Sequence, residues 1–372
     1  MPTALSLLEA FGVLPDPRLE RRKEHRLVDL LVIAVCTLLT GGESFYDMAH
    51  FARLRESWLR TFLALPGGPP SHDTFNRLFA VLDPTAFAET FAAWTESVRA
   101  TLPAGQREIV ALDGKAARRA VNAGEDTRYL VSAWATENGL ALGQVQVADK
   151  SNEITAVPAL LRALELTGCV VTADALHCQK NTAREIVEAD ADYVLALKGN
   201  QGTAHQEIKA ALDDAIARAD PKLASFETIE KGHGRIEMRR YFQSADLDWF
   251  TDKSEWEGLR SVGVVEATRD VDGKVSCERR YYLSSLPVDV ALFARAVRGH
   301  WAIENNLHWV LDVVFGEDQS RARTGFAAAN LGVARRLALN LLHQDQTPAL
   351  STKRKQRQAA FDTDYLANLL KL

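Results

Sequence analysis

The sequence predicts an α/β protein in which a mixed sheet flanked by helices follows an all-helical segment and carries a β-rich insertion. Three observations predict this class. Residues 1–105 show helical spacing of apolar residues and no strand pattern. Short apolar strands alternate with helices from residue 106, and residues 199–290 replace that rhythm with the polar and apolar alternation of strands. The 372 residues are enough for about two domains, since domains commonly hold roughly 150 residues.

The first 105 residues are expected to be helices separated by proline and glycine. The apolar run 27–40 ends at two glycines, and Ser71 is suited to cap a helix that continues to about Leu82. Pro84 stands where the next helix begins, and a proline is tolerated there because the first helical N–H has no partner within the helix. We therefore expect a helical domain over residues 1–105.

From residue 106 the pattern changes to buried strands and helices. One short apolar run ends at Asp113-Gly114, and a second ends at Asp174. Three strands followed by alternating helix and strand are typical of a mixed sheet with helices packed on it. The expected elements are strands 109–112, 129–136 and 140–148, helix 154–166, strand 169–173, helix 181–188 and strand 193–197.

The second half is expected to hold the insertion, two helices and a tail, with residues 106–345 as one domain. Residues 321–372 contain nine Lys/Arg and three Asp/Glu, whereas the whole chain has a net charge of -5. An argument for nucleic-acid binding therefore has to be local. The expected elements are helix 204–217, strands 227–230, 235–242, 261–269 and 274–284, helices 291–314 and 327–342, and a basic tail over 346–372.

Composition argues against several classes of protein. The four cysteines have no Cys-x-x-Cys spacing, so a zinc ribbon or a thioredoxin-like site is not expected. The most apolar run, 30–39, is about half of the ~20 residues that span a bilayer, and the N-terminus shows no export signal. We expect a cytoplasmic protein without a membrane partner. The glycines of 198–202 match neither a Walker A loop nor a dinucleotide fingerprint.

Three acids are candidates for chemistry. Asp113 and Asp174 each follow an apolar strand, where side chains of adjacent strands converge on one rim of a sheet. Glu304 shares a stripe with His300 and His308, because residues four apart lie on one face of a helix. Three carboxylates without a cysteine cluster suit Mg²⁺ or Mn²⁺, and two such ions can promote in-line displacement at a phosphodiester.

Plainer interpretations remain open for each of these residues. An Asp-Gly pair after a strand is more often a turn, and a glutamate on a long helix is usually solvated. His300 and His308 would more often be ordinary hydrogen-bonding residues than metal ligands. A zinc hydrolase that uses His177, His300 and His308 is a further alternative, although their spacing matches no standard zinc motif.

A series of short motifs follows one order along nearly the whole chain before the tail. The most specific is His-Trp-x-Ile-Glu-x-x-Leu-His-Trp, within the block 298–312. The others are Asp16-Pro17-Arg18, Pro70-Ser71-His72-Asp73-Thr74-Phe75, Leu112-Asp113-Gly114-Lys115, 172–179, Leu197-Lys198-Gly199-Asn200-Gln201, and 233–237. With these motifs the chain resembles the H-repeat-associated insertion-sequence transposases, which are DDE transposases with a ribonuclease-H-like core.

The resemblance implies a fold, an activity and a set of site residues. Asp113, Asp174 and Glu304 match the family's catalytic and metal-binding acids, which would hold two Mg²⁺ or Mn²⁺ ions. The implied activity is cleavage of the inverted-repeat ends of an insertion sequence and their transfer to target DNA by a homodimer, in the cytoplasm and at the nucleoid. A catalytically inactive DNA-binding descendant of such a transposase is the alternative.

One departure from the wider relatives affects the expected DNA contacts. Their glutamate helix also carries Tyr, Arg and Lys, and the matching places hold Val297, His300 and Leu311 here. Other side chains must then contact DNA, with helix 71–82 and the tail as further candidates. The side chains that we expect to do so are Lys198, Arg235, Arg298, His300 and Trp301.

Overall fold

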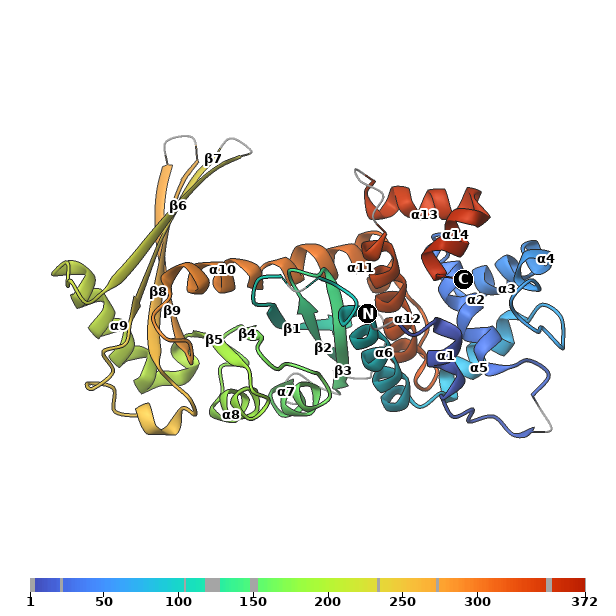
Figure 1. Ribbon diagram of the computed structural model, residues 1–372, viewed down its shortest axis with the longest axis horizontal. Coiled ribbons are helices and arrows are strands. Elements are labelled where there is room, and N and C mark those ends of the chain that lie inside the picture. The colour runs from blue at the N-terminus through green and yellow to red at the C-terminus, as the bar shows by residue number, and fades with distance from the viewer. Residues whose placement is uncertain are drawn as a thin grey trace. The chain divides into compact units, whose positions relative to one another are not determined.

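The computed structural model spans residues 1–372 and describes all except 1–3, 21–22, 104, 118–127, 148–152, 233–234, 272–273, 346–349 and 372, and except the side chains of 116, 117, 128, 146, 153, 232 and 235. The chain divides into two compact units, which are described separately. The helical unit contains Met1–Ala104, Gly114–Ala156 and Glu304–Leu372. The sheet unit contains Gly105–Asp113 and Val157–Ile303. Figure 1 shows the elements by label.

The sheet changes from parallel to antiparallel pairing along its width. β1 (Ile109–Ala117) is parallel to β4 (Val170–Ala173), and β4 is parallel to β5 (Asp192–Leu197). The pairs β2–β3, β5–β9, β6–β7, β7–β8 and β8–β9 are antiparallel, and the last three form the long ribbon of the insertion (Figure 1). The other strands are β2 (Arg128–Ala135), β3 (Leu140–Val147), β6 (Ala224–Gly232), β7 (Arg235–Ser244), β8 (Ser261–Val271) and β9 (Lys274–Ser284). The strand order is β3-β2-β1-β4-β5-β9-β8-β7-β6.

Within the sheet unit, α10 (Val290–His300) lies across the strands and is held by a buried aromatic cluster. The Phe293 ring meets the rings of Tyr241 and Tyr282 edge-on, with centroids 6.5 Å and 5.5 Å away. A Cβ on Gly263 of β8 would lie 2.5 Å from Phe293, so only glycine leaves room for this ring. The packing fixes α10 so that its last turn reaches β4. The other helices around this sheet are α7 (Glu153–Arg162), α8 (Lys180–Glu188), η3 (Gly199–Gln201), α9 (Gly202–Ala217) and η4 (Lys253–Glu255).

The helical unit is centred on α12 (Ala327–Gln344), whose Asn330, Arg336 and Asn340 side chains are buried and hydrogen-bonded. The Asn330 side chain donates to the carbonyls of Phe79 and Leu82, both at 2.9 Å, at the end of one packed helix. The Asn340 side chain exchanges two 2.8 Å hydrogen bonds with the backbone of Ala141 on β3. The other helices are α1 (Leu7–Gly12), α2 (Leu27–Leu39), α3 (Phe45–Leu54), α4 (Glu56–Leu59), α5 (His72–Val81), α6 (Pro84–Arg99), α11 (Trp309–Val313), η6 (Glu317–Gln319), α13 (Thr352–Phe361) and α14 (Thr363–Leu370).

The predicted fold class is confirmed: the chain is an α/β protein with a ribonuclease-H-like mixed sheet flanked by helices, a helical N-terminal part and a β-rich insertion. The alternative interpretation of Asp113-Gly114 as a turn is wrong. Both residues lie inside β1, which continues to Ala117. Among the described residues, no helix is both long enough and apolar enough to cross a membrane.

Two expected elements differ in the structure. The single helix expected over 291–314 is interrupted by η5 (Glu304–His308), a π-helical turn. The segment expected to be a polar tail forms α13 and α14, and Lys355 is buried because its ammonium group donates to the carbonyls of Leu342 and Asp345, both at 2.9 Å. This lysine is therefore not available to neutralise phosphates.

The boundaries of the compact units differ from those of the expected domains. The helices of the N-terminal part share the helical unit with the β2–β3 hairpin and with α11 to α14. Buried contacts of α12 with α2, α5 and α6 explain this grouping, because one long helix provides a common core for segments far apart in sequence. The domain boundaries at 1–105, 106–345 and 346–372 stay predictions.

Candidate active site

The two aspartates lie on neighbouring parallel strands, as the sequence predicts. Leu112 of β1 pairs with Ala173 of β4. Asp113 directly follows Leu112, and Asp174 directly follows Ala173. Both strands run in the same direction, so both carboxylates are at the same edge of the sheet unit. Both residues are half-buried. The edge therefore combines two acids with partial exclusion of water.

The carboxylate of Asp174 is held in place by its own loop. Its Oδ1 accepts hydrogen bonds from the backbone N–H groups of Leu176 at 3.0 Å and His177 at 3.2 Å. This is an Asx-type turn, in which a short acidic side chain caps the backbone that follows it. The turn orients the aspartate side chain immediately after β4.

Two histidines of the sheet unit lie near these acids. His300, at the end of α10, shares a 3.2 Å hydrogen bond between its Nδ1 and the Oγ1 of Thr172 on β4. Burial lowers the pKa of both His300 and His177, although the charges of Asp113 and Asp174 oppose this effect. Both imidazoles are therefore neutral near pH 7, and each can donate from one nitrogen and accept at the other.

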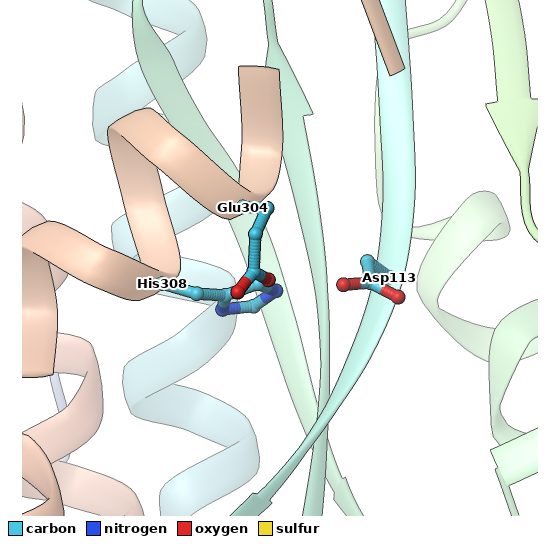
Figure 2. Close-up of side chains that lie close together, drawn as sticks. All are labelled: Asp113, Glu304 and His308. Carbon is cyan, nitrogen blue, oxygen red and sulfur yellow. The ribbon is translucent and has the colours of Figure 1, made fainter. Parts of the chain in front are cut away.

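Glu304 and His308 come from the π-helical turn that follows α10 (Figure 2). Asp113, Glu304 and His308 each offer one ligand atom, and these three atoms lie within 4.8 Å of one another. Figure 2 shows the Glu304 carboxylate beside the His308 ring, with Asp113 on its strand opposite. π-helical turns are rare and occur frequently at functional sites. Two carboxylates and an imidazole fit a divalent cation, because all three groups are common ligands of such ions.

Two known protein families together match most of the chain. The family described as Transposase DDE domain matches residues 104–341, and the family described as DDE_Tnp_1-associated matches residues 8–95. The chain belongs to the DDE transposase family. The resemblance found in the sequence is thereby confirmed.

Individual relatives cover nearly the whole length of this DDE transposase. “Putative transposase YncI” of Escherichia coli O157:H7 is 38% identical over 371 residues, which are 98% of this chain and 94% of the relative. “H repeat-associated putative transposase YhhI” of Escherichia coli (strain K12) is 34% identical and covers 98% of this chain and 97% of its own. A solved piggyBac transposase synaptic complex with hairpin DNA has a TM-score of 0.44 and 11% identity, covering 95% of this chain and 75% of that one.

The structure of this DDE transposase brings some predicted site residues together and separates others. Asp113 and Glu304 share the metal-ligand group, whereas Asp174 and His300 lie outside that group and beside β4. Within the described part of the chain, His177, His300 and His308 do not form a metal-ligand group. The geometry therefore gives no support to the zinc-hydrolase alternative.

The expected DNA-contacting side chains have different surroundings. Arg298 forms a 2.8 Å ion pair with Glu230 of β6. The ring of Trp301 is half exposed, and the guanidinium group of Arg280 lies over it, 5.3 Å from the ring centre. Lys198 is exposed, and the side chain of Arg235 lies outside the described residues. A phosphate would therefore share the Arg298 guanidinium group with Glu230 or displace that carboxylate.

Sequence reasoning missed two residues that position the Asp174 loop. The side chain of Asn200 donates to the carbonyl of Ala175 at 2.6 Å, and the side chain of Gln201 donates to that of Cys178 at 2.7 Å. These bonds tie the loop of Lys198 to the loop of Asp174. The available signal was the Leu197-Lys198-Gly199-Asn200-Gln201 motif, since amide side chains at a strand end are suited to bind exposed backbone carbonyls.

A partly buried ion cluster in the helical unit was also missed. Lys115 follows Asp113 by two residues on β1 and contacts the carboxylates of Asp312, Glu317 and Asp318. Glu317 in turn accepts a 3.0 Å hydrogen bond from the buried Arg336. Burial alone would raise the pKa of Glu317, but the surrounding cations lower it to about 2. The cluster fastens α11, which continues the helix of Glu304, to β1 beyond Asp113.

Proposed function

We propose that this DDE transposase cleaves the ends of an insertion sequence in a metal-dependent reaction and transfers the freed 3′ ends to target DNA. The observation that carries the proposal is the pairing of β1 with β4, which places Asp113 beside Asp174 at one edge of the sheet. The ligand atoms that Asp113 shares with Glu304 support it further. Membership of the DDE transposase family supports DNA as the substrate, and we infer that this DNA is double-stranded and has inverted-repeat ends.

Asp113, Asp174 and Glu304 are the residues that would hold Mg²⁺ or Mn²⁺, as two ions. Bound ions of this kind activate a water or a hydroxyl for attack and stabilise the leaving oxygen of a phosphodiester. His308 adds an imidazole to the set, and imidazole ligands are more usual for transition metals than for Mg²⁺. We therefore expect Mn²⁺ to support cleavage at lower concentration than Mg²⁺.

The surrounding side chains bind and orient the DNA strand. The neutral His300 is held by Thr172 near both aspartates, so it can donate a hydrogen bond to a phosphate oxygen without adding a charge. Lys198 neutralises a flanking phosphate from its tethered loop, and Trp301 offers an exposed apolar surface. Arg298 and Arg235 are further phosphate contacts. The transposase acts as a homodimer that pairs two element ends, in the cytoplasm at the nucleoid.

The test replaces each acid by its amide. Asp113→Asn, Asp174→Asn and Glu304→Gln each keep the side-chain volume and remove one charge that would face the metal. We expect each to lower single-turnover cleavage at least about 100-fold, the loss that is typical when one charge-stabilising group leaves an active site. Binding of element ends is expected to be largely retained. The substrate is the DNA flanking the gene, after its inverted repeats have been identified by sequencing.

The matched control is Asp248→Asn, because that carboxylate is 95% exposed and lies outside the site. Cleavage at the wild-type rate by any of the three amide variants would remove that residue from the catalytic set. A wild-type chain that binds the ends but does not nick them in Mg²⁺ or Mn²⁺ would overturn the proposal and support the inactive DNA-binding alternative.

A further inference from the structure

A second candidate site lies in the helical unit. It is a cavity of about 450 Å³, within the range of small-molecule sites, and it is lined by the first turns of α3 and α5 and by the segment 316–324 between α11 and α12. None of the residues that line it is among the acids and histidines of the candidate active site. Its chemistry therefore has to be explained separately.

The wall formed by the segment after α11 is fixed to α5. The N–H of Phe326 donates to the carbonyl of Ala80 at 3.0 Å. Gly325 has a φ of +53°, and a Cβ there would lie 2.3 Å from the same carbonyl oxygen. Only glycine permits this close approach. The cavity is thus preformed, which lowers the entropy cost of binding a ligand.

One side of the cavity carries an ordered stack of two aromatic rings. The rings of Tyr46 and His72 are nearly parallel, at an interplanar angle of 16° with centroids 4.1 Å apart. Tyr46 is nevertheless 68% exposed, which is unusual for a large aromatic side chain that is held in one orientation. A planar ligand can continue this stack on the tyrosine. Aromatic rings of this kind serve as platforms for nucleic-acid bases.

The polar groups of the cavity indicate which planar ligand fits. Arg321 is exposed and forms no ion pair within the described residues, so it is available for an anion. Asn76 lies one turn after His72 on α5 and can both donate and accept at a base edge. Two acids, Glu43 and Asp73, balance the two arginines 321 and 323. This balance disfavours a free polyanion and favours a base that carries a single phosphate.

We propose that this cavity binds one unpaired nucleotide of a DNA strand. The base stacks on Tyr46, its edge faces Asn76, and its phosphate contacts Arg321. The proposal rests on the proposed function, because that function supplies the DNA. It adds to that function a second contact that recognises distortion of the duplex, at a site distinct from the carboxylate edge.

The test measures binding of two duplexes of the same sequence, one fully paired and one with a single extra 2-aminopurine that has no partner base. The full chain is used, and chelator is present so that no cleavage takes place. We expect the wild-type chain to prefer the bulged duplex and to quench its 2-aminopurine fluorescence, because stacking quenches this base. Tyr46→Ala is expected to weaken binding of the bulged duplex by roughly 5- to 150-fold, since one stacked base commonly contributes that much.

Two further variants distinguish the effects of stacking and of charge on binding from a failure of the chain to fold. Tyr46→Phe keeps the ring and is expected to keep the preference for the bulged duplex. Arg321→Ala is expected to weaken binding and to reduce the slope of log affinity against log salt by about one. The controls are Phe361→Ala and Arg357→Ala, which change exposed side chains of α13 outside the cavity.

The outcomes distinguish the two proposals. Equal binding of both duplexes by the wild-type chain, with Tyr46→Ala unchanged, would overturn the nucleotide site and leave the proposed function intact. A bulge preference that depends on Tyr46, in a chain that cleaves no DNA with metal, would support the site and contradict the catalytic proposal. Binding of neither duplex would overturn both.

Discussion

Two glutamates with largely buried side chains, one in each compact unit, are paired with similar cations but differ in how far those cations are exposed. Glu317 of the helical unit is paired with Arg336, which is 0% exposed, and with Lys115, which is largely buried. Glu266 of the sheet unit is paired with Arg240 and Arg279, whose side chains remain 44% and 31% exposed. The cations around Glu317 are therefore largely shielded from water, whereas the cations around Glu266 remain in contact with water.

The difference teaches where an ion pair matters for stability. A cation that stays in water can replace its carboxylate partner by solvent, so the loss of the partner costs little. A cation with no access to water has no such replacement, and breaking the pair leaves an uncompensated buried charge. Burial alone would raise the pKa of both glutamates. The neighbouring cations instead lower the pKa of Glu266 and lower that of Glu317 to about 2.

The largest expected effect is that of Arg336→Met. This change leaves Glu317 without its buried hydrogen-bond donor and is expected to lower the free energy of unfolding by about 3–5 kcal/mol. Arg240→Met in the sheet unit is the matched control, and we expect a loss below about 1 kcal/mol because its guanidinium is partly exposed. Equilibrium unfolding in urea measures both. Similar losses in the two variants would show that exposure of the cation does not decide the cost.

The pH dependence of stability gives a second test of smaller expected size. The pKa of Glu317 is about 2 in the folded chain and 4.5 as the ordinary value, so the ionised group stabilises the folded state fully above pH 4.5. This contribution, about 3 kcal/mol, is lost as the pH falls towards 2. Urea unfolding at a series of pH values should show this acid loss in the wild-type chain and a smaller one in Glu317→Gln. Parallel curves would contradict the lowered pKa.

The smallest expected effect concerns the exposed pair of Arg298 and Glu230. Both side chains are about half exposed, although their atoms approach to 2.8 Å. A double-mutant cycle with Arg298→Ala and Glu230→Gln is expected to give a coupling energy of about 0.2–1 kcal/mol. Thermal or urea unfolding of the four chains measures it. A coupling energy above about 2 kcal/mol would place this pair with the buried cluster and weaken the proposal that Arg298 can exchange Glu230 for a phosphate.

The positions of Asp113 and Asp174 in the sheet could be predicted from sequence because their signal is local. Buried strands are short apolar runs, so the residue that follows such a run is placed in the sheet by the local pattern, although β1 continues through Asp113 to Ala117. The neighbouring positions of Asp113 and Asp174 needed only the expected order of strands, and the pairing of Leu112 with Ala173 confirms it. Their catalytic roles, and that of Glu304, stay predictions.

Other features depend on contacts that no local pattern contains. The π-helical turn of Glu304 and His308 changes the hydrogen-bond register of a helix without changing its apolar spacing, so periodicity predicted one continuous helix. Lys355 is buried by two backbone carbonyls from another segment, whereas composition alone predicted a solvated tail. The cavity of Tyr46 and Arg321 joins segments far apart along the chain, and only tertiary packing brings them together.

The hydrogen bonds of Asn340 have a consequence for the behaviour of the chain at high concentration. β3 is the last strand on its side of the sheet, and such a strand normally offers free N–H and C=O groups to a strand of another molecule. The Asn340 amide occupies both backbone groups of Ala141, as a neighbouring peptide would do. α12 also contacts this strand, so a strand of another molecule cannot pair with β3 at Ala141.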